Sequence, residues 1–328
     1  MRRYNVRVTT IPLEPLLVRP GRPVLLDGAV GTELARRGIP TTLPLWSAHA
    51  LRTDAGQETL TQIHADYARA GAEILVTNTF RTTRRGLAKG NLGDPGNWRE
   101  MNRRAVAAAR AGLAAARTGP GARDPSTICL VAGGLAPLED CYRPDLVPAE
   151  TECLEEHRRQ AECLARLGVD LIMIETMNSL REARSALVAA VETGLEILLS
   201  LCPKGPRHLL SGEPLDEVIP RLRDAGGSRL RGLLLNCAPP ETLESIFPAF
   251  NTLSPDLPHG LYAHLGEPDD VTGWRLPERH EPERYARWIS DRIGEGARLI
   301  GGCCGTTPAH IAALARLPVS SKPAAKPV

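Results

Sequence analysis

The sequence predicts an α/β protein that folds as a single (β/α)8 barrel. The chain has 328 residues, 42% of them hydrophobic, which is ample for one large core. Eight short apolar runs alternate with amphipathic stretches from one end to the other. Eight strand–helix repeats are typical of this barrel, whereas a doubly wound sheet, the alternative, usually has fewer strands.

The eight strand candidates are nearly continuous in apolar residues, as expected for parallel strands that are buried on both faces. In chain order they are VLLDG (24–28), ILVTNT (74–79), CLVAGGL (129–135), LIMIET (171–176), EILLSLC (196–202), GLLLNC (232–237), GLYAHL (260–265) and LIGGCC (299–304).

The intervening helix candidates carry apolar residues at positions i, i+3, i+4 and i+7, and several close with glycine. The clearest are 59–73, 153–170, 179–194 and 282–297. Segments 81–98 and 136–149 are expected to be long loops after the second and third strands. Residues 1–20 are interpreted as an N-terminal extension, 21–318 as the barrel domain and 319–328 as a disordered tail.

Composition and charge exclude several classes of protein. The formal net charge of +2 gives no indication of a nucleic-acid partner. The sequence contains no run of about 18 apolar residues, so no membrane span is predicted. The N-terminus lacks the apolar core of a secretion signal. Eight cysteines are too few for a disulfide scaffold, so we expect a reducing, cytoplasmic location. The oligomeric state is not indicated, and the expected partners are small-molecule substrates.

Polar and thiol side chains end the predicted strands. In a barrel these ends meet at one mouth, where active sites are found. The residues in question are Asp27, Thr77, Asn78, Glu175, Cys202, Cys237, Cys303 and Cys304. The predicted site is therefore rich in carboxylates and thiols.

Three of these thiols predict a metal site. Cys303 and Cys304 stand within GGCCG, where glycines permit the kink that would turn both side chains toward one ion. Cys237 lies two strands away and can point across the mouth. Three thiolates without a nearby fourth ligand match a Zn²⁺ site with an open position. A vicinal disulfide at 303–304 is the alternative, and it would leave Cys237 unexplained.

The other cysteines are interpreted differently. Cys129, Cys153 and Cys163 are expected to be small buried hydrophobic residues. Cys141 is a loop thiol with no evident partner, and Cys202 has a mouth position but no assigned role.

Asp27 and Glu175 predict a clamp for the ammonium group of an amino acid, because carboxylates facing an interior are costly unless paired. The amides of Gly28 and Ala29, just after Asp27, are suited to an α-carboxylate. The alternative is that both acids pair with neighbouring arginines. Glu73, which precedes its strand, is expected in such a pair at the opposite end.

Six stretches resemble the homocysteine S-methyltransferase family of zinc-dependent barrels. They are LLDGAVGTELARRG (25–38), LWSA (45–48), ADYARAGAEILVTNTF (65–80), DLIMIET (170–176), GLLLNC (232–237) and ARLIGGCCGTTPAHIAAL (297–314). The resemblance implies that Cys237, Cys303 and Cys304 bind zinc and that the homocysteine thiolate completes the tetrahedron. It also implies that Asp27 and Glu175 hold the substrate ammonium, with the Gly28 and Ala29 amides near its carboxylate.

The reaction implied by the resemblance is methyl transfer from a sulfonium donor, S-methylmethionine or S-adenosylmethionine, to homocysteine, giving methionine. Betaine is disfavoured, because Arg81 and Thr176 stand where the betaine enzymes have tyrosine. Glu267, in a Gly-Glu pair resembling that of S-methylmethionine enzymes, and His264 are candidates for the donor side. His208 is a weaker candidate.

Two alternatives remain open at this stage. The acceptor could be another thiol or selenol, such as selenocysteine. The protein could also be a zinc-binding barrel without catalytic activity, although such a protein would have no use for an ammonium clamp.

Overall fold

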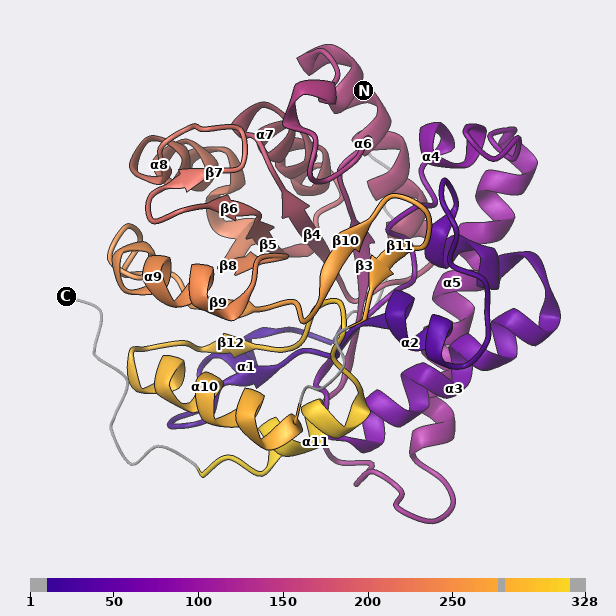
Figure 1. Ribbon diagram of the computed structural model, residues 1–328, viewed down its shortest axis with the longest axis horizontal. Coiled ribbons are helices and arrows are strands. Elements are labelled where there is room, and N and C mark those ends of the chain that lie inside the picture. Colours follow the sequence, from indigo (N-terminus) through magenta and orange to yellow (C-terminus); the bar gives the residue numbers. More distant parts are fainter. Residues whose placement is uncertain (1–10, 277–280, 319–328) are drawn as a thin grey trace.

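The predicted barrel is confirmed. A computed structural model describes residues 11–276 and 281–318, and it contains one eight-stranded parallel sheet (Figure 1). The strand order is β1-β12-β9-β8-β5-β4-β3-β2, and a parallel bridge between Leu26 and Ile74 joins the two edges into a barrel. The strands are β1 (Val24–Leu25), β2 (Ile74–Val76), β3 (Leu130–Leu135), β4 (Leu171–Met177), β5 (Glu196–Leu201), β8 (Leu230–Asn236), β9 (His259–Tyr262) and β12 (Leu299–Ile300).

The strands bury both faces, which explains their continuous apolar sequences. One set of side chains fills the barrel interior, and the alternate set packs outward against the helices. The interior set includes Val24, Leu26, Ile74, Leu130, Ala132, Leu171, Met173, Leu198, Leu234, Tyr262 and Leu299. Their neighbours Leu25, Leu75, Val131, Ile172, Leu199, Leu233, Leu261 and Ile300 belong to the outer core.

Helices surround the sheet (Figure 1). They are α2 (Val30–Arg36), α3 (Asp54–Arg69), α4 (Arg84–Ala88), α5 (Pro95–Ala116), α6 (Glu150–Arg166), α7 (Leu180–Val191), α8 (Leu215–Gly226), α9 (Pro240–Phe250), α10 (Pro282–Gly294) and α11 (Pro308–Ala315), with 3₁₀ turns at Trp46–Arg52, Pro144–Leu146 and Gly227–Arg229. The four clearest helix predictions correspond to α3, α6, α7 and α10. Within the described residues, no helix is both long and apolar enough to cross a membrane.

The expectation of a loop over 81–98 is wrong, because α4 and the start of α5 lie there. The Thr83 hydroxyl caps α4 by accepting the amide of Gly86, and the Asp94 carboxylate caps α5. Pro95 follows as the first residue of α5, a favoured position. Segment 136–149 does form a loop, apart from its single 3₁₀ turn.

The amino ends of the strands form a sealed base. Helix α1 (Glu14–Leu17) lies across it, and Leu13 and Leu16 are buried among the interior side chains of the barrel. The Leu13 amide donates to the Glu196 carboxylate at 2.7 Å. The predicted boundary at residue 21 stays a prediction, and the tail expected at 319–328 lies outside the described residues.

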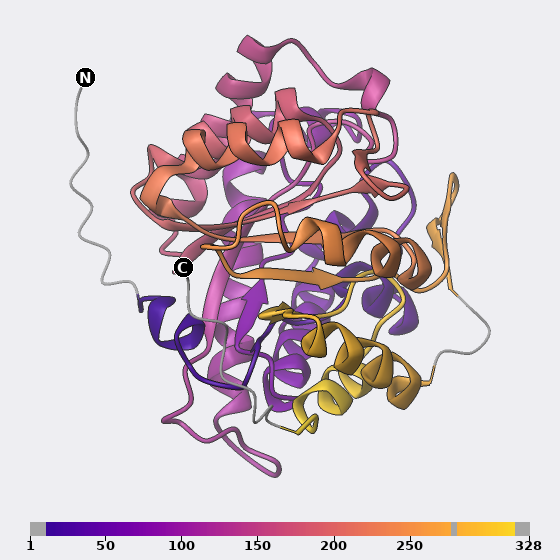
Figure 2. The same cartoon turned by 90° about the vertical axis from the view of Figure 1, so that its left-hand side faces the viewer.

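Two antiparallel hairpins add to the barrel: β6 (Pro203–Lys204) with β7 (His208–Leu209), and β10 (Glu267–Asp269) with β11 (Gly273–Arg275). Figure 2 shows the β10–β11 hairpin at the end of the molecule opposite α1. Its Trp274 donates an indole hydrogen bond to the carbonyl of Leu265 at 2.9 Å. Gly273 has φ +79° and lies so close to Trp46 that a side chain there would collide with the ring.

Candidate functional site

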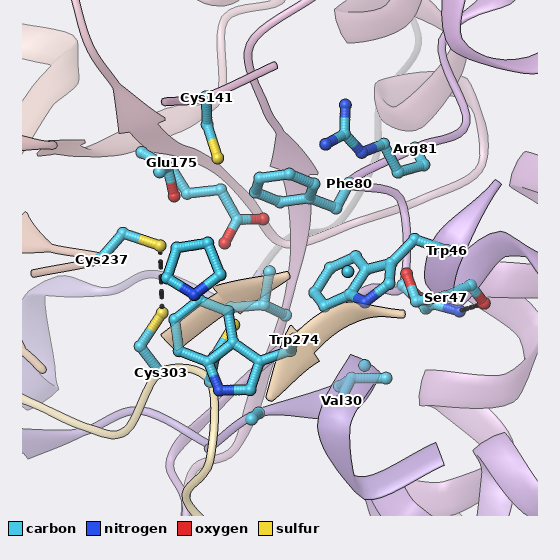
Figure 3. A pocket seen from close by; sticks show the side chains of 18 of the residues that line it. Val30, Trp46, Ser47, Phe80, Arg81, Cys141, Glu175, Cys237, Trp274 and Cys303 are labelled. Carbon is cyan, nitrogen blue, oxygen red and sulfur yellow. Dashed lines mark hydrogen bonds between the residues drawn. The ribbon is translucent and has the colours of Figure 1, made fainter. Parts of the chain in front are cut away.

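A cavity of about 300 Å³ opens at the carboxyl ends of the strands. Its lining includes seven of the predicted site residues: Asp27, Gly28, Ala29, Glu175, Cys237, Cys303 and Cys304. Figure 3 shows Cys237 and Cys303 facing each other, with Glu175 beside them. The structure therefore brings the strand-end residues of this set together at one mouth, and their roles stay a prediction.

The thiols gather around the sulfur of Cys237. The Cys303 thiol donates to it with an Sγ–Sγ distance of 3.6 Å. Hydrogen bonds from Cys141, Cys303, Cys304 and His264 hold the pKa of the Cys237 thiol well below its usual range, despite its burial. The arrangement thus already favours a thiolate at Cys237.

The donor set and its spacing fit a zinc ion. Two sulfurs bound to one tetrahedral Zn²⁺ at 2.3 Å are about 3.8 Å apart, close to the separation of Cys237 and Cys303. Within residues 11–276 and 281–318, however, no three Cys, His, Asp or Glu side chains already surround a position suited to a metal ion. Binding would therefore draw the thiols inward from the arrangement described.

Two non-glycine residues at the strand ends have a left-handed backbone: Thr176 in β4 (φ +63°) and Cys237 after β8 (φ +55°). This conformation is an outlier for a β-branched residue and costs about 1–3 kcal/mol. At Thr176 it coincides with an irregularity in the pairing of β4 with β5 between Ile174 and Met177. Such irregularities re-aim side chains next to active sites, and here the residue affected is Glu175.

A buried polar network joins these two strand ends inside the barrel. The Ser200 hydroxyl accepts the Thr176 amide at 3.2 Å and donates to the Asn236 side chain at 2.9 Å. Asn236 in turn donates to the Thr176 hydroxyl at 2.8 Å, and Tyr262 lies 2.6 Å from Ser200. Since Asn236 immediately precedes Cys237, the network fixes a carboxylate and a thiol to a common frame.

The two mouth carboxylates lack a cationic partner among the described residues, so the alternative of arginine pairing is not supported. Asp27 accepts a hydrogen bond from the Val76 amide at 2.9 Å, and burial raises its pKa well above the usual value. Burial raises the pKa of Glu175 to about 8, with contributions from the negative charges of Asp27 and Cys237. Both acids would be stabilised as carboxylates by an incoming ammonium group.

Space for the Glu175 carboxyl is provided by Gly134 on β3. A side chain at this position would come within 2.8 Å of the nearer Glu175 oxygen and 3.1 Å of the Thr79 hydroxyl. The glycine is therefore part of the site, although the sequence gives no signal that distinguishes it from Gly133.

The turn after Asp27 lines the cavity, but one of its amides is already bonded. The Ala29 amide donates to the Thr306 hydroxyl at 3.2 Å. A substrate carboxylate at this turn would have to share or replace that hydrogen bond. The roles of Gly28 and Ala29 in substrate binding stay a prediction.

None of the candidates for the donor side is among the residues that line the cavity, and their roles stay a prediction. Glu267 is exposed and is not among the residues that line the cavity. His264 is buried behind the lining, where its ring packs edge-on against Trp274 and lies 3.5 Å from the Tyr142 hydroxyl. His208 is exposed in the β6–β7 hairpin. Cys202, which had no assigned role, contacts the backbone carbonyl of Cys237 rather than its sulfur.

Sequence reasoning missed the aromatic walls and one thiol. Trp46, Phe80, Tyr142 and Trp274 line the cavity, and Trp46 packs edge-on against Phe80 at 5.7 Å between ring centres. Tyr142 donates to the sulfur of Cys237 at 3.3 Å. Cys141, next to Tyr142, lines the cavity too. Cys141 and Tyr142 lie on the loop after β3, and no strand periodicity marks which residues of a loop return to the mouth.

Comparisons with known proteins agree with this geometry. The profile of the family described as homocysteine S-methyltransferase matches residues 24–317. The chain is 33% identical to the homocysteine S-methyltransferase of Escherichia coli over 89% of this chain and 94% of that protein. It is 30% identical to the Bacillus subtilis homocysteine S-methyltransferase YbgG, over 89% and 93% of the two chains.

A solved structure shares the whole fold. The metallated form of the homocysteine methyltransferase MmuM from Escherichia coli superposes with a TM-score of 0.79 at 31% identity, covering 93% of this chain and 99% of that one. The barrel, the mouth thiols and these matches together establish that the chain belongs to the homocysteine S-methyltransferase family.

Proposed function

We propose that the protein transfers a methyl group from a sulfonium donor to the thiol of homocysteine, and that Cys237, Cys303 and Cys304 hold a zinc ion for this purpose. The observation that carries the proposal is that these thiols meet two carboxylates in one cavity, and that neither carboxylate has a cationic partner within the part of the chain that the structure describes. A site with this composition can bind both the sulfur and the ammonium group of one small amino acid.

Zinc, when bound, would keep the substrate thiol deprotonated and so supply the nucleophile without a protein base. Asp27 and Glu175 accept the ammonium group from two sides of the mouth. Their placement fixes the direction in which the substrate chain extends toward the thiols. Orientation of this kind supplies much of the rate enhancement for a displacement at a methyl group.

The donor is assigned from the cavity walls. Aromatic faces attract onium cations, and Trp46, Tyr142 and Trp274 provide such faces next to the thiols. This lining would also suit betaine. The lining carries both charges, with Asp140, Asp269 and Asp270 as well as Arg81 and Arg143. Its acidic groups favour a donor that carries an ammonium group besides its methylated centre. S-methylmethionine and S-adenosylmethionine have that group, whereas betaine does not.

The test is methionine formation from homocysteine with four donors offered separately: S-methylmethionine, S-adenosylmethionine, betaine and methyltetrahydrofolate. We expect turnover with one or both sulfonium compounds, and loss of turnover and of bound zinc in Cys303→Ser. Turnover with betaine or methyltetrahydrofolate alone would contradict the donor assignment. Zinc-independent turnover by Cys303→Ser would contradict the metal site.

A further inference from the structure

Cys141 is a fourth thiol at the mouth. It lies on the loop between β3 and α6, it is 5% exposed, and Figure 3 shows its side chain pointing into the cavity. The loop is fixed at this point, because Asn178 donates to the carbonyl of Cys141 at 3.0 Å and Tyr142 donates to the sulfur of Cys237. The position of the thiol is therefore held by its neighbours on both sides.

The Cys141 thiol hydrogen-bonds to the sulfur of Cys237, the same atom that Cys303 contacts at 3.6 Å. Cys304 also hydrogen-bonds to this sulfur. Three thiols thus meet the sulfur of a fourth, and the inward shift that zinc binding requires would bring all four toward one ion. Four cysteines are the donor set of a closed zinc site, whereas three cysteines and an open position are the set that a thiol substrate requires.

We propose that Cys141 is the fourth zinc ligand while homocysteine is absent, and that homocysteine replaces it on binding. This inference rests on the zinc site proposed above. In the exchange one zinc–sulfur bond breaks and another forms, and the proton of the homocysteine thiol passes to the released Cys141 sulfur. No oxidation occurs, and the charge on the metal centre stays the same.

The exchange would protect the resting site. A closed set of four thiolates leaves no open position for water or a foreign ligand, and it holds zinc more tightly than three thiolates and water. Homocysteine has to compete with Cys141, so the affinity for the substrate is lower than an open site would give. Loss of the Cys141 sulfur should therefore weaken zinc binding and strengthen homocysteine binding.

The test uses the full chain loaded with Co²⁺ in place of zinc, because thiolate-to-cobalt charge-transfer absorption grows with the number of bound thiolates. We expect the unsubstituted protein to absorb as a four-thiolate site, and Cys141→Ser to lose about a quarter of that intensity, in proportion to its ligand count. Homocysteine should restore the intensity of Cys141→Ser and leave that of the unsubstituted protein nearly unchanged.

Two variants serve as matched controls. Cys163→Ser removes a half-buried thiol of α6 that does not line the cavity, and Cys202→Ser removes the thiol that contacts only the Cys237 backbone. Both should keep the four-thiolate spectrum. Zinc competition with a chromophoric chelator gives a second measurement, in which Cys141→Ser should bind zinc about tenfold more weakly, with the difference lost at saturating homocysteine.

A three-thiolate spectrum in the unsubstituted protein that rises with homocysteine would overturn the role of Cys141 while leaving the zinc site intact. Absence of thiolate charge transfer in every variant, including the unsubstituted protein, would instead overturn the zinc site itself. Far-ultraviolet circular dichroism of Cys141→Ser separates either result from misfolding.

Discussion

The two ends of the barrel treat the same kind of side chain in opposite ways. At the base, Glu73 pairs with Arg19 at 2.6 Å and Asp170 pairs with Arg110 at 2.8 Å. At the mouth, Asp27 and Glu175 lack a cationic partner among the described residues. A carboxylate at a strand end is therefore not informative by itself; its partner, or the lack of one, distinguishes a structural acid from a binding acid.

The surroundings differ in the same sense. The base is filled by leucine side chains, and α1 lies across it. The mouth holds thiols, aromatic rings and a cavity of about 300 Å³. Substitutions at the base should therefore change stability, whereas substitutions at the mouth should change substrate binding.

The largest effect is expected for Glu175→Gln at the mouth. It removes a charge that meets the substrate ammonium in a buried site, so kcat/KM for homocysteine should fall about 10²–10³-fold. The thermal midpoint should not fall, because the substitution also removes a desolvated carboxylate. Steady-state kinetics with varied homocysteine measures the fall in kcat/KM, and thermal unfolding measures the midpoint. An unchanged KM would show that Glu175 does not hold the substrate ammonium group. Asp27→Asn should behave alike.

At the base, Glu73→Gln should lower the free energy of unfolding by about 2 kcal/mol, because Arg19 loses its partner in a largely buried pair. The kcat/KM of the folded enzyme should stay within about twofold of the original. Urea denaturation measures the first quantity and kinetics the second. A loss of activity without a loss of stability would break the distinction between the two ends.

A smaller effect on binding is expected for Gly134→Ala, since the new methyl group would press on the Glu175 carboxyl at 2.8 Å. We expect KM for homocysteine to rise about tenfold, roughly 1.4 kcal/mol. Gly133→Ala is the matched control, because its methyl group would instead face Leu164 and Val169 in the outer layer. Equal KM values for the two variants would show that Gly134 does not position Glu175.

The smallest effect on substrate binding is expected for His64 of α3, which lies outside both ends and should affect stability alone. Its ring nitrogens are buried without hydrogen-bond partners among the described residues, and burial lowers its pKa to about 4. Between pH 6.5 and 4 the unfolded chain binds a proton that the folded chain does not, so stability should fall with pH by up to about 3 kcal/mol.

His64→Leu should flatten this pH dependence of the unfolding free energy and leave KM unchanged. His208→Gln, an exposed control, should change neither the pH dependence nor KM. A change in KM at His64 would mean that a buried group without a partner affects substrate binding even when it lies far from the mouth.

The sequence was sufficient for the barrel and for part of the mouth. Each continuous apolar run marks one parallel strand, and the residue at its carboxyl end is visible in the sequence. Because the strands of a barrel end at the same mouth, Asp27, Glu175, Cys237, Cys303 and Cys304 could be placed together. Glu73 was likewise expected at the opposite end in an arginine pair, and it is found there.

What could not be predicted depends on contacts between distant loops. Tyr142 and Cys141 meet Cys237 across 95 and 96 residues of chain, and nothing in the periodicity of segment 136–149 indicates that it folds back over the mouth. The left-handed backbone at Thr176 is imposed by Ser200 and Asn236 on two other strands. Local patterns carry no information about such long-range hydrogen bonds.

Helix α1 determines where the N-terminus of a truncated protein can be placed. A clone that starts at residue 21, just before the first strand, would discard Leu13 and Leu16, which are 0% and 3% exposed. Removal of each buried leucine side chain should lower the free energy of unfolding by about 2–5 kcal/mol. It would also expose the interior of the barrel to solvent. Shortened or fused versions of the protein should therefore keep Leu13 and Leu16, with any N-terminal linker attached upstream of Leu13.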